Sequence, residues 1–337
     1  MAFPAFNRRK MLRIAAIATA ALAVAGGLGG WLVYDSLDDG IRTDTAAADA
    51  LAGADDRPPA GPPGTQNILV IGSDDRSAKD GRYGPATPGS VRSDTVMLVH
   101  ISERQRRAEV VNIPRDLLVY TPRCRNRGGG WAQGQRTQFN WAFEIGGTAC
   151  TVRTFEKLTN IRADHHILVD FKGFKQIVNA VGGVEVDLPK AEEDPNVGLD
   201  VPAGRQVLRD EDALAYVRAR INVGDGSDAN RIRRQHEFLG LLAEKVKDKG
   251  TLSDPRKLYP ILKGATSSLT TDPGLDSLPE LYGLAKKLRD IPQDRIAFRS
   301  TPSMIYPEDP NRLITREPQA TQLFAALRTD QRAASRA

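Results

Sequence analysis

The stretch that decides the fold is N-I-L-V-I at 67–71, which leads directly into Gly72-Ser73-Asp74. A short apolar run that ends at turn residues is typical of a buried strand. Two further runs follow it, T-V-M-L-V-H-I at 95–101 and A-E-V-V-N-I at 108–113, and the second ends in Pro114-Arg115-Asp116. These patterns predict two more strands, joined by a polar turn.

Further along, strand-like and helix-like runs alternate. We predict strands at 166–171, 184–188 and 295–300, and helices at 150–158, 172–180, 211–216, 229–249 and 275–289. This order is typical of an α/β protein. It predicts one domain over residues 67–326, followed by a polar tail at 327–337.

The composition is that of an ordinary globular protein. The chain has 337 residues, 40% of them hydrophobic and 26% charged, and 47 Lys and Arg against 42 Asp and Glu give a net charge of +5. These values exclude a disordered, collagen-like or disulfide-dense protein, and a mean hydropathy of −0.38 excludes a polytopic membrane protein. The mild positive charge does not argue for nucleic-acid binding.

The N-terminus resembles a membrane anchor. Basic residues in the segment 1–13 precede the uncharged segment 14–34, which would span about 31 Å as a helix, enough to cross a bilayer. By the positive-inside rule, 1–13 is expected in the cytoplasm and the rest of the chain outside the cell. A signal peptide cleaved near the small residues at 21–25 is the alternative. Either would export the domain.

The next segment, 35–66, is rich in Ala, Asp, Gly and Pro and has little apolar content. Such a composition predicts a flexible to extended extracellular linker.

The chain has two cysteines, Cys124 and Cys150. In an exported domain we expect them to form a disulfide that closes the glycine-rich loop around 127–130. Two unpaired thiols are the alternative.

Common catalytic motifs are absent. The sequence contains no G-x-S-x-G, G-x-x-x-x-G-K-[ST], H-E-x-x-H or C-x-x-C, which argues against a serine hydrolase, a P-loop enzyme and a zinc protease. The four histidines, His100, His165, His166 and His236, offer no zinc-ligand spacing.

Arginine and aspartate instead recur at strand ends and turns and on the helix at 229–249. The residues concerned are Asp74, Arg76, Arg92, Asp94, Arg115, Arg218, Arg220, Arg231 and Gln235. Arginine binds phosphate through two parallel hydrogen bonds, and Mg²⁺ takes carboxylate and phosphate oxygens. The set therefore predicts a bound phosphate-containing polyanion with a divalent cation. Arg218 and Arg220 would serve one ligand only if the backbone between them is extended.

Several motifs together resemble the LytR-CpsA-Psr family. They are G-S-D-D-R at 72–76, R-S-D-T-V-M-L-V-H-I at 92–101, V-V-N-I-P-R-D at 110–116, L-T-N-I-R-A-D-H-H-I-L-V-D-F-K-G-F at 158–174, V-G-G-V-E-V at 181–186, A-L-A-Y-V-R-A-R at 213–220 and R-I-R-R-Q-H at 231–236. One departure is visible, because family members commonly have R-Q-Q where this chain has Arg234-Gln235-His236.

The resemblance implies a three-layer α/β/α domain with a central mixed sheet, preceded by a single transmembrane helix. It also implies an apolar pocket for a polyprenyl chain beside an arginine-lined mouth. Arg115, Arg218 and Arg220 would be the catalytic arginines. Arg76, Arg92, Arg231 and Gln235 would bind the diphosphate, and Asp74 and Asp94 would bind Mg²⁺.

The implied function is a phosphotransferase at the outer face of the cell membrane. It would move a glycopolymer with one phosphate from a polyprenyl-diphosphate carrier to a hydroxyl of peptidoglycan, in cell-wall biogenesis. The alternatives are a polyprenyl-diphosphate hydrolase, a non-catalytic lipid binder and a transcriptional attenuator. The export signal argues against the attenuator and against a nucleic-acid partner.

Overall fold

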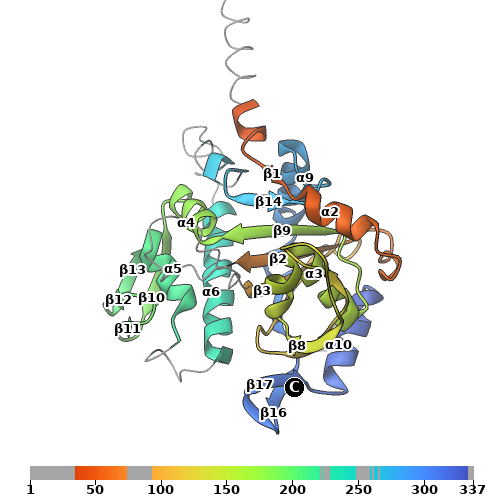
Figure 1. Ribbon diagram of the computed structural model, residues 1–337. Helices are drawn as coiled ribbons and strands as arrows, with labels where there is room; N and C mark the ends of the chain where they lie inside the picture. Colours follow the sequence, from red (N-terminus) through yellow and green to blue (C-terminus); the bar gives the residue numbers. More distant parts are fainter. Residues whose placement is uncertain are drawn as a thin grey trace, which may run out of the picture.

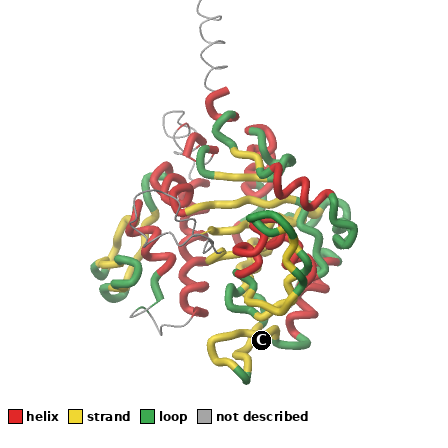
Figure 2. The backbone as a smooth tube through the Cα atoms, viewed as in Figure 1, coloured by secondary structure: helices red, strands yellow, loops and turns green. Residues whose placement is uncertain are grey.

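A seven-stranded sheet forms the centre of the computed structural model, which describes residues 35–73, 93–220, 223, 228–247, 259, 262–264 and 266–332 (Figures 1 and 2). Its strands are β1 (Arg42–Thr43), β2 (Thr65–Ser73), β3 (Ser93–Ser102), β4 (Arg107–Ile113), β9 (His165–Asp170), β14 (Leu269–Thr271) and β15 (Ile296–Ser300). They lie in the order β1-β14-β9-β2-β3-β4-β15. Parallel and antiparallel neighbours both occur, which confirms the expected mixed sheet.

Helices cover both faces of the sheet. One face packs against α2 (Thr45–Ala52), α3 (Trp141–Thr159) and α10 (Gln319–Arg328), where Leu69 and Leu98 of the sheet meet Phe155 of α3. The other face packs against α9 (Leu278–Arg289), where Ile68 lies in one apolar cluster with Ile291. The alternating inward and outward side chains of the strands explain why the sheet has two cores.

A lobe with its own core lies beyond the carboxyl ends of β2 and β9 (Figure 1). It comprises α4 (Phe171–Ala180), β10 (Val184–Leu188), β11 (Glu192–Asp194), β12 (Leu199–Val201), β13 (Gly204–Leu208), α5 (Asp210–Arg218) and α6 (Asp228–Lys247). Val178, Leu208, Tyr216 and Phe238 are buried together there. The lobe thereby places α5 and α6 beside one end of the sheet.

Three hairpins complete the described structure. They pair β5 (Leu118–Thr121) with β8 (Gln135–Gln138), β6 (Cys124–Arg125) with β7 (Trp131–Ala132), and β16 (Ser303–Tyr306) with β17 (Asp309–Thr315). A short 3₁₀ helix, η1 (Gln293–Arg295), precedes β15.

The prediction of a flexible to extended linker at 35–66 is wrong, because this segment is folded onto the domain. β1 pairs with β14, and Asp44 caps α2 by accepting a hydrogen bond from the backbone N–H of Ala47 at 3.0 Å. Leu37 and Leu51 are buried. A few well-spaced apolar residues and one cap suffice here, since the rest of the domain supplies the surface on which they are buried.

The polar tail begins later than residue 327. Helix α10 continues to Arg328, and Leu327 is buried in the core. The Asp330 carboxylate accepts hydrogen bonds from Ser102 at 2.8 Å and Arg107 at 3.0 Å. A buried arginine therefore holds this carboxylate inside the domain, which composition alone does not indicate.

The helices differ from their predicted bounds, α3 most of all. Helix α3 starts at Trp141 instead of residue 150, and Gly146 and Gly147 interrupt it with non-helical backbone angles. Helix α5 starts at Asp210 and continues to Arg218, two residues beyond its predicted end. Within the part of the chain that the structure describes, no helix is long and apolar enough to cross a bilayer. The predicted segments 1–13 and 14–34 lie outside the described residues.

Candidate functional site

The candidate site lies where several strands end at one edge of the sheet. β2, β9 and β4 run in the same direction, and β3 runs against them. Ser73 at the end of β2 pairs with Asp170 on one side and with Ser93 on the other. Because carboxyl ends of parallel strands meet at one edge, the side chains that follow β4 and β9 gather near the start of β3.

Arg115 and Asp94 form an ion pair at this edge. The Arg115 Nη1 atom donates to Oδ1 of Asp94 at 2.9 Å, and its Nε lies 3.6 Å from Oδ2 of Asp116. Gln138 in turn donates to the other oxygen of Asp116 at 2.9 Å. Pro114 ends β4 just before this arginine, so the backbone and two carboxylates together orient the guanidinium.

Arg218 lies beyond the end of β9. It is the last residue of α5, and its guanidinium carbon lies 4.5 Å from the centre of the Phe171 ring, a cation–π contact. Phe171 directly follows β9 and begins α4. Arg218 therefore approaches the same sheet edge as Arg115, from the lobe.

Arg220 follows after one extended residue, because Ala219 has φ −58° and ψ 139°. The backbone requirement for Arg218 and Arg220 to share a ligand is thus met at the residue between them. The backbone N–H of Arg220 donates to Oδ2 of Asp194 at 2.7 Å, and its side chain is exposed.

Helix α6 supports the turn that carries these arginines. The Gln235 side chain donates to the backbone carbonyl of Val217 at 3.0 Å, so this amide positions the end of α5. Arg231, one helical turn earlier, is buried. The structure therefore brings both expected residues of α6 to the lobe side of the site.

Three expected residues, Asp74, Arg76 and Arg92, lie outside the described residues. Among the residues that are described, no three His, Cys, Asp or Glu side chains are grouped to hold a metal. Asp94 offers one carboxylate that remains a quarter exposed beside Arg115. This donor fits a Mg²⁺ ion that takes most of its ligands from phosphate and water.

Sequence reasoning missed Arg234. Its Nη1 atom donates to the backbone carbonyls of Tyr216 at 3.0 Å and Ala219 at 2.8 Å, and its guanidinium lies 5.3 Å from the centre of the Tyr216 ring. The buried guanidinium therefore closes the C-terminus of α5, next to Arg218. In the sequence Arg234 is one of several arginines in a charged run, which gives no signal of burial.

Asp170 and Phe171 were also missed as site residues. Oδ1 of Asp170 accepts from the backbone N–H of Gly173 at 2.6 Å and caps α4, and Arg42 lies 3.5 Å from its other oxygen. An aspartate at the end of a strand and two residues before the pattern K-G is a helix-cap signal that could have located this turn.

Two side chains next to the candidate site have altered pKa values. Burial, reinforced by the nearby Glu192, raises the pKa of Tyr216 to about 12, so its hydroxyl stays neutral. Burial lowers the pKa of His236, whose ring packs against Phe298 with ring centres 5.3 Å apart. His236, where the sequence departs from R-Q-Q, thus packs a neutral imidazole against the sheet.

Next to the site, the sheet face under α9 and α6 is apolar and incompletely covered. Val70, Val99 and Ile167 lie on this face and are only partly buried, and Phe298 is 36% exposed. The face continues along β2 towards Gly72, at the edge where Asp94 lies.

The expected disulfide is confirmed. Cys124 and Cys150 are bonded, with their Cα atoms 5.6 Å apart. The bond joins β6 to α3, on the opposite side of the sheet from α9.

The comparisons with known proteins agree on one family. The family model LytR_cpsA_psr matches residues 42–329. LcpA, a cell wall biosynthesis protein of Corynebacterium glutamicum, is 30% identical over 264 residues, which are 71% of this chain and 50% of that protein. The polyisoprenyl-teichoic acid–peptidoglycan teichoic acid transferase TagV of Bacillus subtilis is 29% identical over 96% of this chain and 78% of its own length.

Solved structures support the same fold. A LytR-Csp2A-Psr enzyme from Actinomyces oris superposes with a TM-score of 0.63 at 21% identity, over 81% of this chain and 90% of that one. This chain spans only about half the length of the corynebacterial relatives that it matches. Since the family model covers most of the chain, this protein belongs to the LytR_cpsA_psr family.

Proposed function

We propose that this protein is a membrane-anchored, extracellular phosphotransferase. It would move a glycopolymer with its phosphate from a polyprenyl-diphosphate carrier to a hydroxyl of peptidoglycan. The observation that carries the proposal is the approach of Arg115, from the central sheet, and Arg218, from the lobe, to one sheet edge next to an apolar sheet face. TagV, named as a teichoic acid transferase to peptidoglycan, supports the same class of reaction.

The arginines suit phosphoryl transfer. Such a transfer needs little covalent help from the protein and depends on positioning and on neutralising charge that spreads over phosphate oxygens. Arg115 would hold one phosphate while Asp94 and Asp116 keep its guanidinium oriented. Arg218 and Arg220 would hold the leaving phosphate from the lobe, because Gln235 and Arg234 hold the backbone carbonyls on either side of Arg218.

The apolar sheet face suits a polyprenyl chain. Val70, Val99, Ile167 and Phe298 would pack against the lipid, since burying their remaining exposed surface is favourable by roughly 25 cal/mol per Å². The neutral ring of His236 fits this environment better than a charged one. The lipid's diphosphate would then lie at the edge where the apolar face ends.

Mg²⁺ is part of the proposal. Asp94 and Asp74 would hold the ion, which would supply positive charge against the phosphate oxygens. Asp94 already accepts a hydrogen bond from Arg115, so a guanidinium occupies one of its carboxylate oxygens. Whichever group takes the acceptor's proton, Asp94 is better suited to hold charge than to act as the base.

The proposed location is the cell membrane, with 1–13 in the cytoplasm, 14–34 across the bilayer and the folded domain outside. The charge pattern of the sequence and the disulfide in the domain support it, because disulfides persist in oxidising compartments. An exported domain would not meet nucleic acid, which disfavours a transcriptional attenuator.

The decisive experiment supplies the purified full chain with a polyprenyl-diphosphate-linked glycan and uncrosslinked peptidoglycan, and identifies the products by mass spectrometry. A glycan joined to peptidoglycan through one phosphate is expected. Release of free glycan phosphate without attachment would replace the transferase by a hydrolase, and an unchanged donor would leave a lipid binder.

A further inference from the structure

A cavity lies on the sheet face opposite the apolar one. It has a volume of about 930 Å³ and runs between α2 and a loop that we call the disulfide loop, residues 123–131. Ser73 is one of its lining residues. Because Ser73 pairs with Ser93 and Asp170, the cavity reaches the same sheet edge as the candidate site.

The disulfide loop presents an aromatic ring and positive charge to the cavity. Trp131 on β7 is 53% exposed, and the guanidinium carbon of Arg123 lies 4.6 Å from the centre of its indole. Arg125, the cross-strand partner of Trp131, is also exposed. An indole with an open face beside arginines is a binding surface for ligands that are partly apolar and partly polar.

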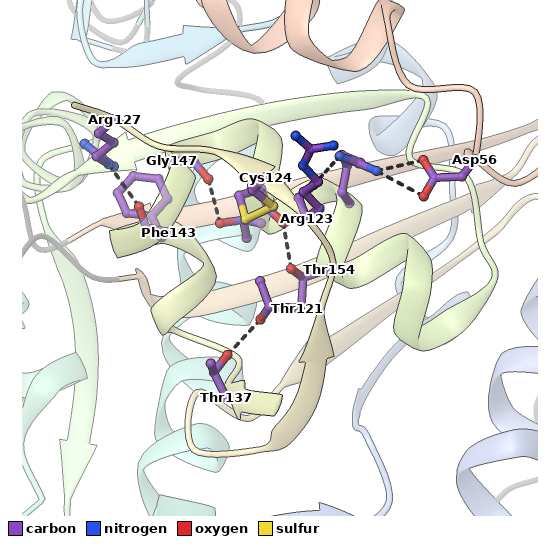
Figure 3. The surroundings of a disulfide bond; sticks show 12 residues. Asp56, Thr121, Arg123, Cys124, Arg127, Thr137, Phe143, Gly147 and Thr154 are labelled. Atoms are coloured by element: carbon purple, nitrogen blue, oxygen red, sulfur yellow. Dashed lines mark hydrogen bonds and ion pairs between the residues drawn. A yellow bond between two sulfur atoms is a disulfide. The ribbon is translucent and has the colours of Figure 1, made fainter. Parts of the chain in front are cut away.

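Several contacts hold this loop against α3. The disulfide ties Cys124 to Cys150, and the Arg127 side chain donates to the backbone carbonyl of Phe143 at 3.0 Å while lying over its ring (Figure 3). At Gly146 a Cβ atom would lie only 2.6 Å from the Arg125 carbonyl, so only glycine permits the close approach. The loop is therefore a fixed wall of the cavity before any ligand arrives.

The opposite wall is α2 and the turn after it, which offer small and acidic side chains. Ala46 and Ala50 of α2 and Ala54 of the turn leave room in the cavity, and Asp49 and Asp55 add negative charge. The helix is docked at its start, because the backbone N–H of Asp44 donates to the carbonyl of Thr271 at 2.7 Å and its carboxylate lies 3.7 Å from Nε2 of His166.

We infer that this cavity binds a glycan strand, the acceptor of the proposed reaction. Its volume is within the range of ligand sites, and sugar rings have apolar faces that stack on an indole and hydroxyls that bond to charged groups. The lining charges balance, with Arg123, Arg125, Arg127 and Arg153 facing Asp44, Asp49, Asp55 and Asp56, which disfavours a polyanionic donor. That the bound glycan is the acceptor rests on the proposed function. That the cavity binds a glycan does not depend on it.

The test measures binding without any donor. The purified full chain in detergent is titrated by calorimetry with a soluble tetrasaccharide of alternating N-acetylglucosamine and N-acetylmuramic acid. Trp131→Ala and Arg125→Glu should each weaken binding at least tenfold. Tyr282→Ala, at a tyrosine 60% exposed on α9, and Arg205→Ala, at an arginine side chain 78% exposed in the lobe, are the matched controls and should bind as the wild type does.

The outcomes separate this inference from the proposed function. Wild-type affinity in both Trp131→Ala and Arg125→Glu overturns the inference, even where transfer to peptidoglycan is observed. Tighter binding of a soluble poly(glycerol phosphate) than of the tetrasaccharide also overturns it, in favour of the donor polymer. Glycan binding that depends on Trp131 supports it, even if no transferase activity is found and the proposed function fails.

Discussion

Nη1 of Arg115 lies 2.9 Å from Oδ1 of Asp94, which joins a guanidinium and a carboxylate from two adjacent strands at the edge of the sheet. Both side chains remain 25% exposed. The pair is thus partly desolvated and still open to a ligand. Each partner can therefore be replaced without leaving a cavity in the hydrophobic core.

Replacing Arg115 by alanine should abolish most transfer. Loss of one donor that stabilises developing charge typically slows turnover by about 100-fold or more. We expect Arg115→Ala to lower kcat at least that much, measured with lipid-linked donor, while its melting temperature stays near that of the wild type. Arg205→Ala should retain full turnover. Unchanged turnover in Arg115→Ala would remove this residue from the site.

Asp94→Asn should weaken the metal dependence. The amide keeps the shape of the side chain and can still accept a hydrogen bond from Arg115, but it loses the negative charge that a divalent cation requires. We expect about a tenfold higher Mg²⁺ concentration for half-maximal activity, and weaker Mn²⁺ binding by electron paramagnetic resonance. Full activity of the wild type in excess chelator would refute the metal site.

Arg234→Met should destabilise the lobe. The substitution leaves the carbonyls of Tyr216 and Ala219 without their charged donor, and hydrogen bonds to charged groups contribute about 1.5–3 kcal/mol each. We expect unfolding in urea to show a loss of about 3 kcal/mol. The neighbouring Arg233→Met, whose side chain is 71% exposed, is the control and should cost little. Equal stabilities of the two variants would contradict the structural role of Arg234.

Removing the disulfide should destabilise the domain through its unfolded state. Cys124 and Cys150 are 26 residues apart, and closing such a loop is worth about 3.5 kcal/mol in the chain-entropy model. The variant with both cysteines changed to serine should lose roughly that much in urea. Dithiothreitol should lower the stability of the wild type alone. A double variant as stable as the wild type would show that the bond only fixes the loop locally.

The pair His165 and Asp272 should make stability depend on pH. A hydrogen bond to Asp272, at 3.0 Å, outweighs burial and raises the pKa of His165. Burial raises the pKa of Asp272, but hydrogen bonds from His165 and His166 outweigh it and lower that pKa. The histidine's contribution is complete below its unfolded pKa of 6.5 and is lost as pH rises through its higher folded pKa.

This effect is measured by urea unfolding at pH 5.5 and pH 8.5. His165→Gln should be less stable than the wild type by about 1 kcal/mol at pH 5.5, and the difference should shrink at pH 8.5. A difference that grows with pH would contradict the raised pKa of His165.

The central strands were predictable from the sequence because their signal is local. The runs at 67–71, 95–101 and 108–113 are apolar enough to be strands in any context, and the turns that end them carry the polar residues of the site. Arg115 was found for that reason, and its place at this edge follows from strand direction. Arg218 was found in the motif at 213–220, and its approach to the same edge depends on how the lobe packs.

Features that depend on distant partners were not predictable. The segment 35–66 looks like a linker because Leu51 acquires its apolar partners only from the folded sheet and from α3. Asp330 looks like part of a polar tail because its partner Arg107 is 223 residues away in sequence. The role of Arg234 likewise depends on carbonyls in another helix.

The burial of Leu37 has a consequence for how the domain would meet the proposed lipid carrier. Leu37 is 3% exposed, so only Asp35 and Ser36 stand between the body of the protein and Tyr34, the last residue of the proposed membrane helix. Both residues are helical, so each adds a rise of only about 1.5 Å. The domain would therefore lie directly against the headgroups, and a carrier diffusing in the leaflet would have only a short way to move from the bilayer to the apolar sheet face.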